Sequence, residues 1–148
     1  MAFHYRLEAV LRLQRSIENQ EEHRLLACVV RVTALRNQIA EWERERSNRQ
    51  RMAAAEMQAG TTGVALSVLA DWDRGAKRRQ AEILPQFEQA EHARRAQVAR
   101  LQQARQKREV LESLKERLET AYDLEELRRV QQVLDDMFLT RAFYYKAR

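Results

Sequence analysis

Apolar residues recur at spacings of three and four along the first third of the chain. From residue 25 onward they are Leu25, Cys28, Val32, Leu35, Ile39 and Trp42. This spacing predicts an amphipathic helix that packs along a partner helix. Phe3, Leu7, Val10 and Ile17 begin the same stripe. Between Ile17 and Leu25 the steps become four and four through Glu21, so we expect a local departure from the seven-residue repeat there.

A second apolar stripe occupies the other side of a glycine-containing break. It consists of Leu69, Trp72, Ala76, Ile83, Phe87, Ala90, Val98, Leu101, Ala104, Leu111, Leu114 and Leu118. Within it, Gly75 lowers helix propensity by about 1 kcal/mol relative to alanine, and Pro85 by roughly 3 kcal/mol. Because the apolar spacing resumes at Phe87, we expect a kink or a short break at residues 83–85 and no domain boundary.

The break between the stripes predicts a turn. Residues 58–66 hold two of the three glycines in the chain. The rest of the sequence has only one glycine and one proline, so few residues there would interrupt a helix. We therefore predict an all-α fold, a single domain over residues 1–148 built as a long antiparallel two-helix coiled-coil hairpin. The first helix is expected over about 3–57, the tip loop over about 58–66, and the second helix over about 67–140 with Ser67 as its N-cap.

Equal rise per residue in the two helices sets the expected register. Residues whose numbers sum to roughly 123 should lie opposite one another. Leu35 then lies near Phe87, and Val10 near Leu114. Everything after about Tyr122 extends beyond the paired region, although its apolar residues keep a helical spacing.

Aromatic residues gather where the two chain ends meet in this hairpin. Seven of the ten lie in the first five residues or beyond residue 120: Phe3, Tyr5, Tyr122, Phe138, Phe143, Tyr144 and Tyr145. Two helices cannot bury that much aromatic surface between them, and exposed aromatic clusters often mark protein contacts. The alternative is that the carboxyl-terminal segment folds back and packs these rings on the amino-terminal turn.

Charged residues gather at the opposite end, near the predicted turn. Basic residues there are Arg44, Arg46, Arg49, Arg51, Arg74, Lys77, Arg78 and Arg79, with acidic residues interspersed. One interpretation is a docking surface for acidic groups. The other is a solvated face of ion pairs at offsets of three and four residues. Trp72 favours docking a little, because a large ring is difficult to cover at a thin, charged tip.

Composition limits the environment and the partners. The 148 residues are 33% charged, with a net charge of +5 and a single cysteine; the mean hydropathy of −0.69 argues against a thick globular core. No apolar run approaches the roughly 20 residues that span a bilayer, and the first residues lack the apolar core of a signal peptide. We expect a soluble cytoplasmic protein with an acidic partner, which charge alone leaves open among nucleic acid, protein and anionic lipid.

Catalytic motifs are not found. The three histidines have no cysteine or carboxylate cluster at metal-ligand spacing around them. Cys28 falls on the apolar seam, where a small buried side chain is expected. Gly60 and Gly63 are not followed by the Gly-Lys-Ser/Thr of a phosphate loop. The sequence therefore predicts no enzyme, no metal, no cofactor and no small-molecule substrate.

Three segments together resemble a known family. Residues 2–14 read Ala-Phe-His-Tyr-Arg-Leu-Glu-Ala-Val-Leu-Arg-Leu-Gln, Gly63 opens the second helix, and Trp72 follows nine residues later. The Glu-Glu-Leu-Arg-Arg stretch at residues 125–129 and Asp-Asp-Met at 135–137 are similar in style. The chain looks like the FliJ proteins of the bacterial flagellar type III export apparatus, and the resemblance covers essentially the whole chain.

The resemblance implies a function and its partners. FliJ proteins are small antiparallel coiled coils similar to that of the F-type ATPase gamma subunit. They associate with the export ATPase FliI, with the export gate protein FlhA and with export chaperones. The chain would then be a non-enzymatic stalk or adapter, cytoplasmic and peripherally associated with the export apparatus at the inner membrane.

By the same analogy, two surfaces receive roles. The expected contact with the ATPase ring consists of Phe3, Leu7, Val10, Leu114 and Leu118. The expected contact with the gate consists of Trp72, Arg78 and Arg79. Other members often carry aromatic and aliphatic residues in the turns after the tip aromatic, where this chain has Gly75 and Arg79, so its gate contact should depend more on charge.

Two other classes remain open. One is a basic coiled coil that binds nucleic acid, although acidic residues are interspersed with the basic ones and most aromatics lie elsewhere. The other is a generic dimerising scaffold, which predicts two parallel chains. A salt titration with arbitrary DNA tests the first, and molecular mass in solution tests the second.

Overall fold

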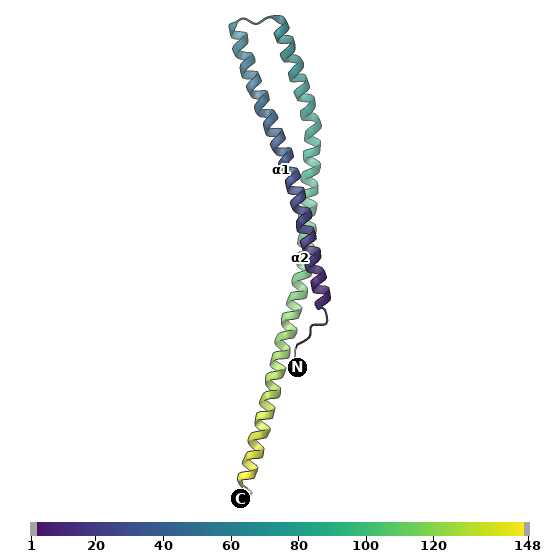
Figure 1. Ribbon diagram of the computed structural model, residues 1–148, viewed down its shortest axis with the longest axis vertical. Helices are drawn as coiled ribbons and strands as arrows, with labels where there is room; N and C mark the ends of the chain where they lie inside the picture. The colour runs from purple at the N-terminus through teal and green to yellow at the C-terminus, as the bar shows by residue number, and fades with distance from the viewer. Residues whose placement is uncertain (1–2, 147–148) are drawn as a thin grey trace. The chain divides into compact units, whose positions relative to one another are not determined.

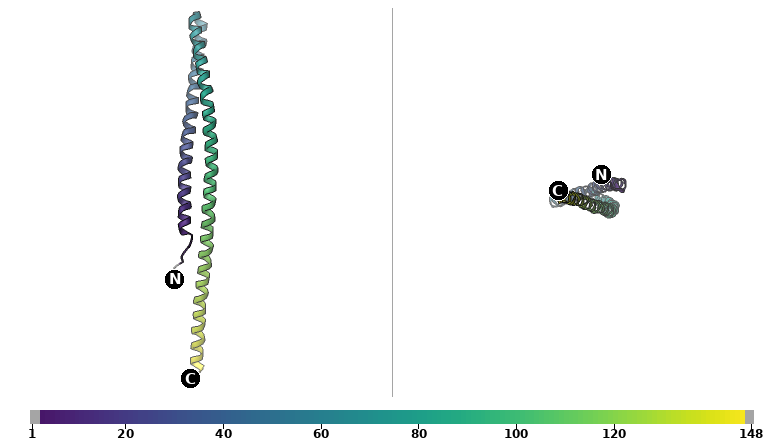
Figure 2. Two further views of the ribbon diagram at one scale, coloured as in Figure 1. Left: turned by 90° about the vertical axis from the view of Figure 1, so that its right-hand side faces the viewer. Right: turned by 90° about the horizontal axis from the view of Figure 1, so that it is seen from below.

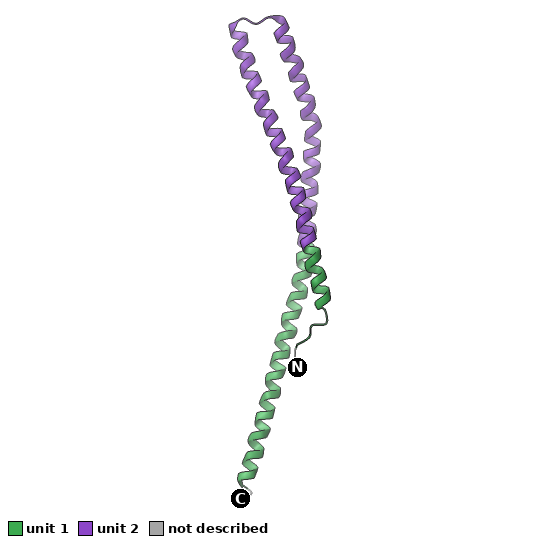
Figure 3. Cartoon of the chain, in the orientation of Figure 1, with its two compact units in different colours: residues 1–18, 103–148 green, residues 19–102 purple. Residues whose placement is uncertain are grey.

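A computed structural model describes residues 3–146, which form two helices. Helix α1 spans Glu8–Ala59, helix α2 spans Gly63–Lys146, and residues 60–62 connect them (Figure 1). The chain divides into two compact units: residues 1–18 with 103–148 form unit 1, and residues 19–102 form unit 2 (Figure 3). Within each unit the two helices pack against each other in opposite directions, and the described residues contain no strand. The predicted all-α helical hairpin is confirmed.

The helix ends differ from the predicted ones. Helix α1 begins at Glu8, about five residues late, because residues 3–5 are extended and the Glu8 amide donates to the Tyr5 carbonyl oxygen at 3.2 Å in a turn. The connection has three residues where nine were expected, so Ser67 lies inside α2 and does not cap it. Helix α2 also continues to Lys146, beyond the predicted end near residue 140.

Gly60 fixes where α1 ends. Its φ of +90° lies in the left-handed region, which costs a residue with a Cβ free energy but is open to glycine. The Gly60 amide donates to the Met57 carbonyl oxygen at 3.4 Å, which closes the last turn. Only the first of the two glycines in the predicted loop therefore acts as a helix stop, and Gly63 is the first residue of α2.

Pro85 does not break α2, so of the kink or short break expected at residues 83–85 the break is absent. A proline inside a helix leaves the carbonyl oxygen four residues earlier without its donor. Here that residue is Ala81, which is exposed, as is Pro85 itself. Water can replace the lost hydrogen bond, and apolar residues on the buried side, Ile83 and Phe87, keep the helix on its partner.

The apolar seam of unit 2 agrees with the prediction. Buried or half-buried residues on α1 are Leu25, Cys28, Val32, Leu35, Ile39 and Trp42, and on α2 they are Leu69, Trp72, Ala76, Ile83, Phe87, Ala90, Val98 and Leu101. Arg36 lies over the Phe87 ring, 5.9 Å from its centroid. Arg46 pairs with Asp73 at 3.0 Å. These contacts match the expected antiparallel register.

The seam of unit 1 differs from the prediction. Leu11 is fully buried (0% exposed) and Glu18 is nearly so, whereas Ile17 is half-buried and Val10 is 40% exposed. Counting back from Leu25 in alternating steps of three and four gives Glu21, Glu18, Gln14 and Leu11. All four are at least half-buried. The seven-residue repeat of α1 is therefore unbroken, and the expected departure from it between residues 17 and 25 was wrong.

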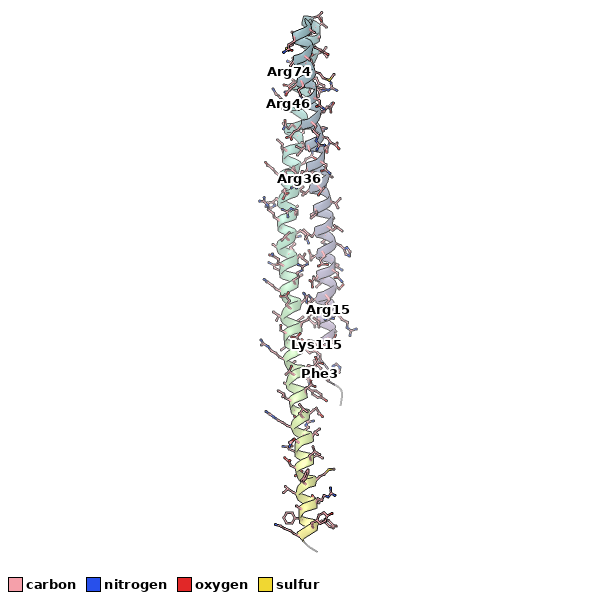
Figure 4. The ribbon with its side chains drawn as sticks, turned by 90° about the vertical axis from the view of Figure 1, so that its left-hand side faces the viewer. Phe3, Arg15, Arg36, Arg46, Arg74 and Lys115 are labelled. Atoms are coloured by element: carbon pink, nitrogen blue, oxygen red, sulfur yellow. The ribbon has the colours of Figure 1, made fainter. Side chains whose placement is uncertain are left out.

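Polar pairs from α2 make this seam possible. Within unit 1, Arg108 forms ion pairs with both Glu18 and Glu112. Arg15 meets Glu112 at 2.9 Å, and Lys115 meets Glu8 at 2.8 Å, which is close to the expected register (Figure 4). A carboxylate can occupy a seam position when cationic donors satisfy its oxygens.

Gly75 and Gly60 should respond oppositely to replacement by alanine. A Cβ at Gly75 would meet open space in the interior of α2, so Gly75→Ala should stabilise the protein by about 0.5–1 kcal/mol. Gly60→Ala also meets open space but must adopt the positive φ, so it should destabilise by about 1 kcal/mol. Urea unfolding followed by circular dichroism measures both, and equal shifts in the midpoint would contradict this account.

Candidate functional site

The amino-terminal segment is held against α2 in unit 1. Tyr5 is buried, and its hydroxyl donates to the Leu111 carbonyl oxygen at 3.0 Å. The Phe3 ring lies 5.7 Å from the Tyr122 ring, in a tilted arrangement. Two aromatic contacts therefore fix residues 3–7 before α1 begins.

The five residues expected to contact the ATPase ring all belong to unit 1. Phe3, Leu7 and Leu118 line one open groove. Val10 and Leu114 each precede a residue of the seam by one position and remain part-exposed. In an antiparallel coiled coil, residues such as these, one position before a seam residue in each helix, lie on the same side of the seam. The structure thus places Val10 and Leu114 beside the seam, leaves Leu7 and Leu118 part-exposed at its end, and packs Phe3 on Tyr122; none of the five is fully buried.

Tyr122 and Ala121 complete the groove, and charged residues edge it. Arg6 and Glu125 line the groove together with the apolar residues. An apolar floor with a polar edge is the arrangement that protein-binding surfaces commonly have. Tyr122 belongs to this surface although the family resemblance did not assign it to the ring contact.

Ion pairs beside the groove shift several pKa values. The Lys115 ammonium holds the pKa of the Glu8 carboxyl below its ordinary value. Arg15, with help from Arg108, lowers the pKa of the Glu112 carboxyl. Hydrogen bonding to Glu18 raises the pKa of the Arg108 guanidinium. These shifts all favour the charged forms of Glu8, Glu112 and Arg108, so the ion pairs hold the register of the two helices.

The carboxyl-terminal segment, residues 123–146, does not fold back. Helix α2 is continuous to Lys146 and extends past the beginning of α1 within unit 1 (Figure 2). Its aromatic residues Phe138, Phe143 and Tyr145 are largely exposed, and Tyr144 is 79% exposed. Of the seven aromatics near the chain ends, Phe3, Tyr5 and Tyr122 are buried or half-buried in unit 1, and the other four are largely exposed.

The tip of unit 2 contains the expected aromatic residue, but Trp72 is half-buried. It lines a small cavity between the helices with Trp42, Ile39, Ala76 and Ile83. The Arg49 guanidinium lies 4.4 Å from the centre of the Trp72 ring, a cation–π contact that covers one face. Trp72 is therefore largely part of the helix packing.

The charges of the tip divide into paired and unpaired groups. Asp73 accepts from both Arg46 and Lys77 at 3.0 Å, and Arg74 pairs with Asp71. The Lys77 contact, followed by Arg46, lowers the pKa of the Asp73 carboxyl. Arg78 and Arg79 are exposed and have no ion pair within residues 3–146. Ion pairs thus account for half of the eight basic residues of the tip, and Arg78 and Arg79 are among the four that have no ion pair in the described residues.

In residues 3–146 no group of three or more histidine, cysteine or acidic side chains could hold a metal ion, and no helix is apolar over enough length to cross a membrane. No protein-family model, curated protein or solved structure matches the chain.

The polar residues of the seam were missed from the sequence. Glu18 and Gln97 are both buried, and Gln97 donates to the Glu21 carbonyl oxygen at 3.2 Å in unit 2. An apolar pattern selects Ile17 over Glu18 because it scores hydrophobicity alone. Extending the strict seven-residue repeat from Leu25 toward the amino terminus would have found Glu18, and counting back four residues from Leu101 on α2 would have found Gln97.

Acid should weaken the hairpin through the lowered carboxyl pKa values. Glu8, Glu112 and Asp73 have folded-state pKa values below their ordinary values of 4.5 and 3.8. Above their ordinary pKa values these carboxylates make their full contribution to the free energy of unfolding. That contribution is lost as the pH falls through the lowered pKa values of the folded state. We expect the thermal midpoint, measured by circular dichroism, to fall below about pH 4.5.

Glu112→Gln tests this assignment. This variant should have a lower thermal midpoint at pH 7. Its thermal midpoint should also fall less on acidification, because one titrating carboxylate has been removed from the ion pairs. Glu119→Gln is the matched control, since Glu119 is exposed and has no ion pair in the described part of the chain. An acid response that is the same in both variants would rule out Glu112 as a source of it.

Proposed function

We propose that this chain is a non-enzymatic adapter of flagellar type III export, of the FliJ kind. In this proposal it binds the export ATPase FliI through the groove of unit 1, meets the export gate protein FlhA through the tip of unit 2, and helps to escort export chaperones. It would act in the cytoplasm at the export apparatus of the inner membrane. The antiparallel helix pair is the fold that the resemblance implies. Residues 3–7, within the segment that resembles the start of FliJ proteins, form one side of the groove.

The observation that carries the proposal is the part-exposed apolar groove. Leu7 and Leu118 line this groove together with the Phe3 and Tyr122 rings, which contact each other. Because Tyr5 already anchors the segment through its hydrogen bond to Leu111, a partner would not have to order this surface on binding. A preformed surface loses less conformational entropy in a complex, which favours affinity.

The tip supports an electrostatic contact with the gate. Trp72 offers little free ring surface beneath Arg49, whereas Arg78 and Arg79 are exposed and unpaired among the described residues. Arginine presents a planar fork of donors that suits carboxylates. An acidic face on the gate protein is the partner that these two side chains would fit.

The mechanism requires no covalent step. One chain would hold two assemblies by surfaces of different chemistry, one apolar and one cationic, so that each assembly recognises its own surface. Nucleic acid is the less favoured partner, because Arg46, Arg49 and Arg74 already pair with carboxylates and acidic residues are interspersed with the basic ones of the tip. Binding to arbitrary DNA that weakens steeply with added salt would favour the nucleic-acid alternative.

Charge in the groove should weaken ATPase binding. In the full chain, Leu7→Glu with Leu118→Glu should weaken binding to purified FliI by roughly tenfold or more, since each change places a carboxylate on a surface that is buried in the complex. Stimulation of phosphate release by FliI should fall in parallel. Calorimetry and a phosphate-release assay measure the two effects.

Leu26→Glu is the matched control for this experiment. Leu26 is an exposed leucine of unit 2, outside the groove, so its replacement should leave binding unchanged. Circular dichroism should confirm that both variants keep their helical content. Normal FliI stimulation by the groove variant would refute the assignment of this surface.

A further inference from the structure

The carboxyl-terminal segment, residues 123–146, carries an apolar stripe that nothing in unit 1 covers. Its apolar members are Leu124, Leu127, Val130, Val133, Leu134, Met137 and Phe138, all of which are part or largely exposed. Their spacing is that of a coiled-coil seam, with steps of three and four from Leu127 to Met137. A helix with a long uncovered seam commonly pairs with another helix.

This stripe lies on a different side of α2 from the seam that faces α1. Tyr122 belongs to the α1-facing seam, and Leu124 follows two residues later, about 200° around the helix. The α1-facing phase continues instead through Glu125 and Arg129, which pair with each other at 2.8 Å. The carboxyl-terminal stripe is therefore a separate interface and does not extend the hairpin.

Two charged residues occupy seam positions of this stripe. Continuing the steps of three and four outward from Leu127 and Met137 reaches Asp123 on one side and Arg141 on the other. Neither has an ion pair within residues 3–146. A charge in a seam is costly without a partner, so these two residues constrain what can cover the stripe.

We propose that the carboxyl-terminal segment pairs with the same segment of a second copy of this chain, antiparallel, about a two-fold axis at Gln132. In this register Leu127 lies opposite Met137, and Val130 opposite Leu134. Asp123 of each copy then lies opposite Arg141 of the other. Beside the seam, Leu124 lies near Phe138, and Val133 near its own counterpart.

Charge selects this arrangement over the alternatives. In a parallel pair, Asp123 would face Asp123 and Arg141 would face Arg141, so like charges would meet in the seam. A slip of seven residues in the antiparallel pair places Arg141 opposite Val130, or Asp123 opposite Leu134.

The contact is isologous, so each pairing occurs twice and one surface serves both copies. The inference does not depend on the proposed export function, since it uses only residues 123–141. It differs from the parallel scaffold considered from the sequence, because direction and register follow from Asp123 and Arg141.

A charge-swap cycle in the full chain tests the proposal by sedimentation equilibrium. The wild-type chain should approach twice its 17.6 kDa mass as concentration rises. Asp123→Arg or Arg141→Asp alone should weaken self-association on the order of tenfold or more, because two like-charge pairs replace two ion pairs. The double variant should recover most of the affinity, as should an equimolar mixture of the two single variants.

An apolar substitution checks the stripe itself. Leu134→Glu should leave the chain monomeric and equally helical, whereas Val110→Glu, at an exposed valine of unit 1 outside the stripe, should not change the mass. A wild-type chain that is monomeric at every concentration would overturn the proposal. So would a dimer that is unaffected by either single charge reversal. These measurements use no ATPase, so their failure is distinct from failure of the proposed function.

Discussion

The unbroken seven-residue repeat of α1 is the constraint on which the rest of the structure depends. It continues through Gln14, Glu18 and Glu21, where apolar side chains would bury more hydrophobic surface. Arg108 makes this possible by pairing with Glu18 and Glu112. A buried ion pair adds little net stability, but a mismatched one is costly. These polar residues therefore act mainly to specify the register in which the two helices of unit 1 meet.

Aliphatic residues of unit 1 also lie exposed around this seam. Val10 and Leu114 each precede a seam residue, Leu11 and Lys115, and stay part-exposed beside it. Leu7 and Leu118 remain open in the groove because α1 has only just begun at Glu8. Unit 1 therefore has ion pairs within its helix seam and exposed aliphatic side chains around it. The exposed aliphatic surface is suited to protein contact.

The sequence was sufficient for the hairpin, its direction and the seam of unit 2, because Leu25 to Trp42 are apolar at every seam position. It was insufficient where a single contact decides the outcome. The start of α1 depends on the buried Tyr5 and its long-range hydrogen bond to Leu111, which periodicity does not contain. The length of the connection depends on which of two glycines adopts a positive φ. The coverage of Trp72 depends on the rotamer of Arg49, a residue that the sequence pattern assigned only to a charged face.

The phase change after Tyr122 separates the internal contacts of α2 from its external ones. If the apolar stripe had kept its original phase, it would have stayed on one side of α2. The groove and the carboxyl-terminal segment would then have formed one continuous exposed apolar surface. Moving the stripe by two residues turns it to another side of the helix, and the Glu125–Arg129 pair makes the original side polar. A partner on the groove and a helix on the carboxyl-terminal stripe would then approach from different directions, so one helix could serve two interfaces without direct competition.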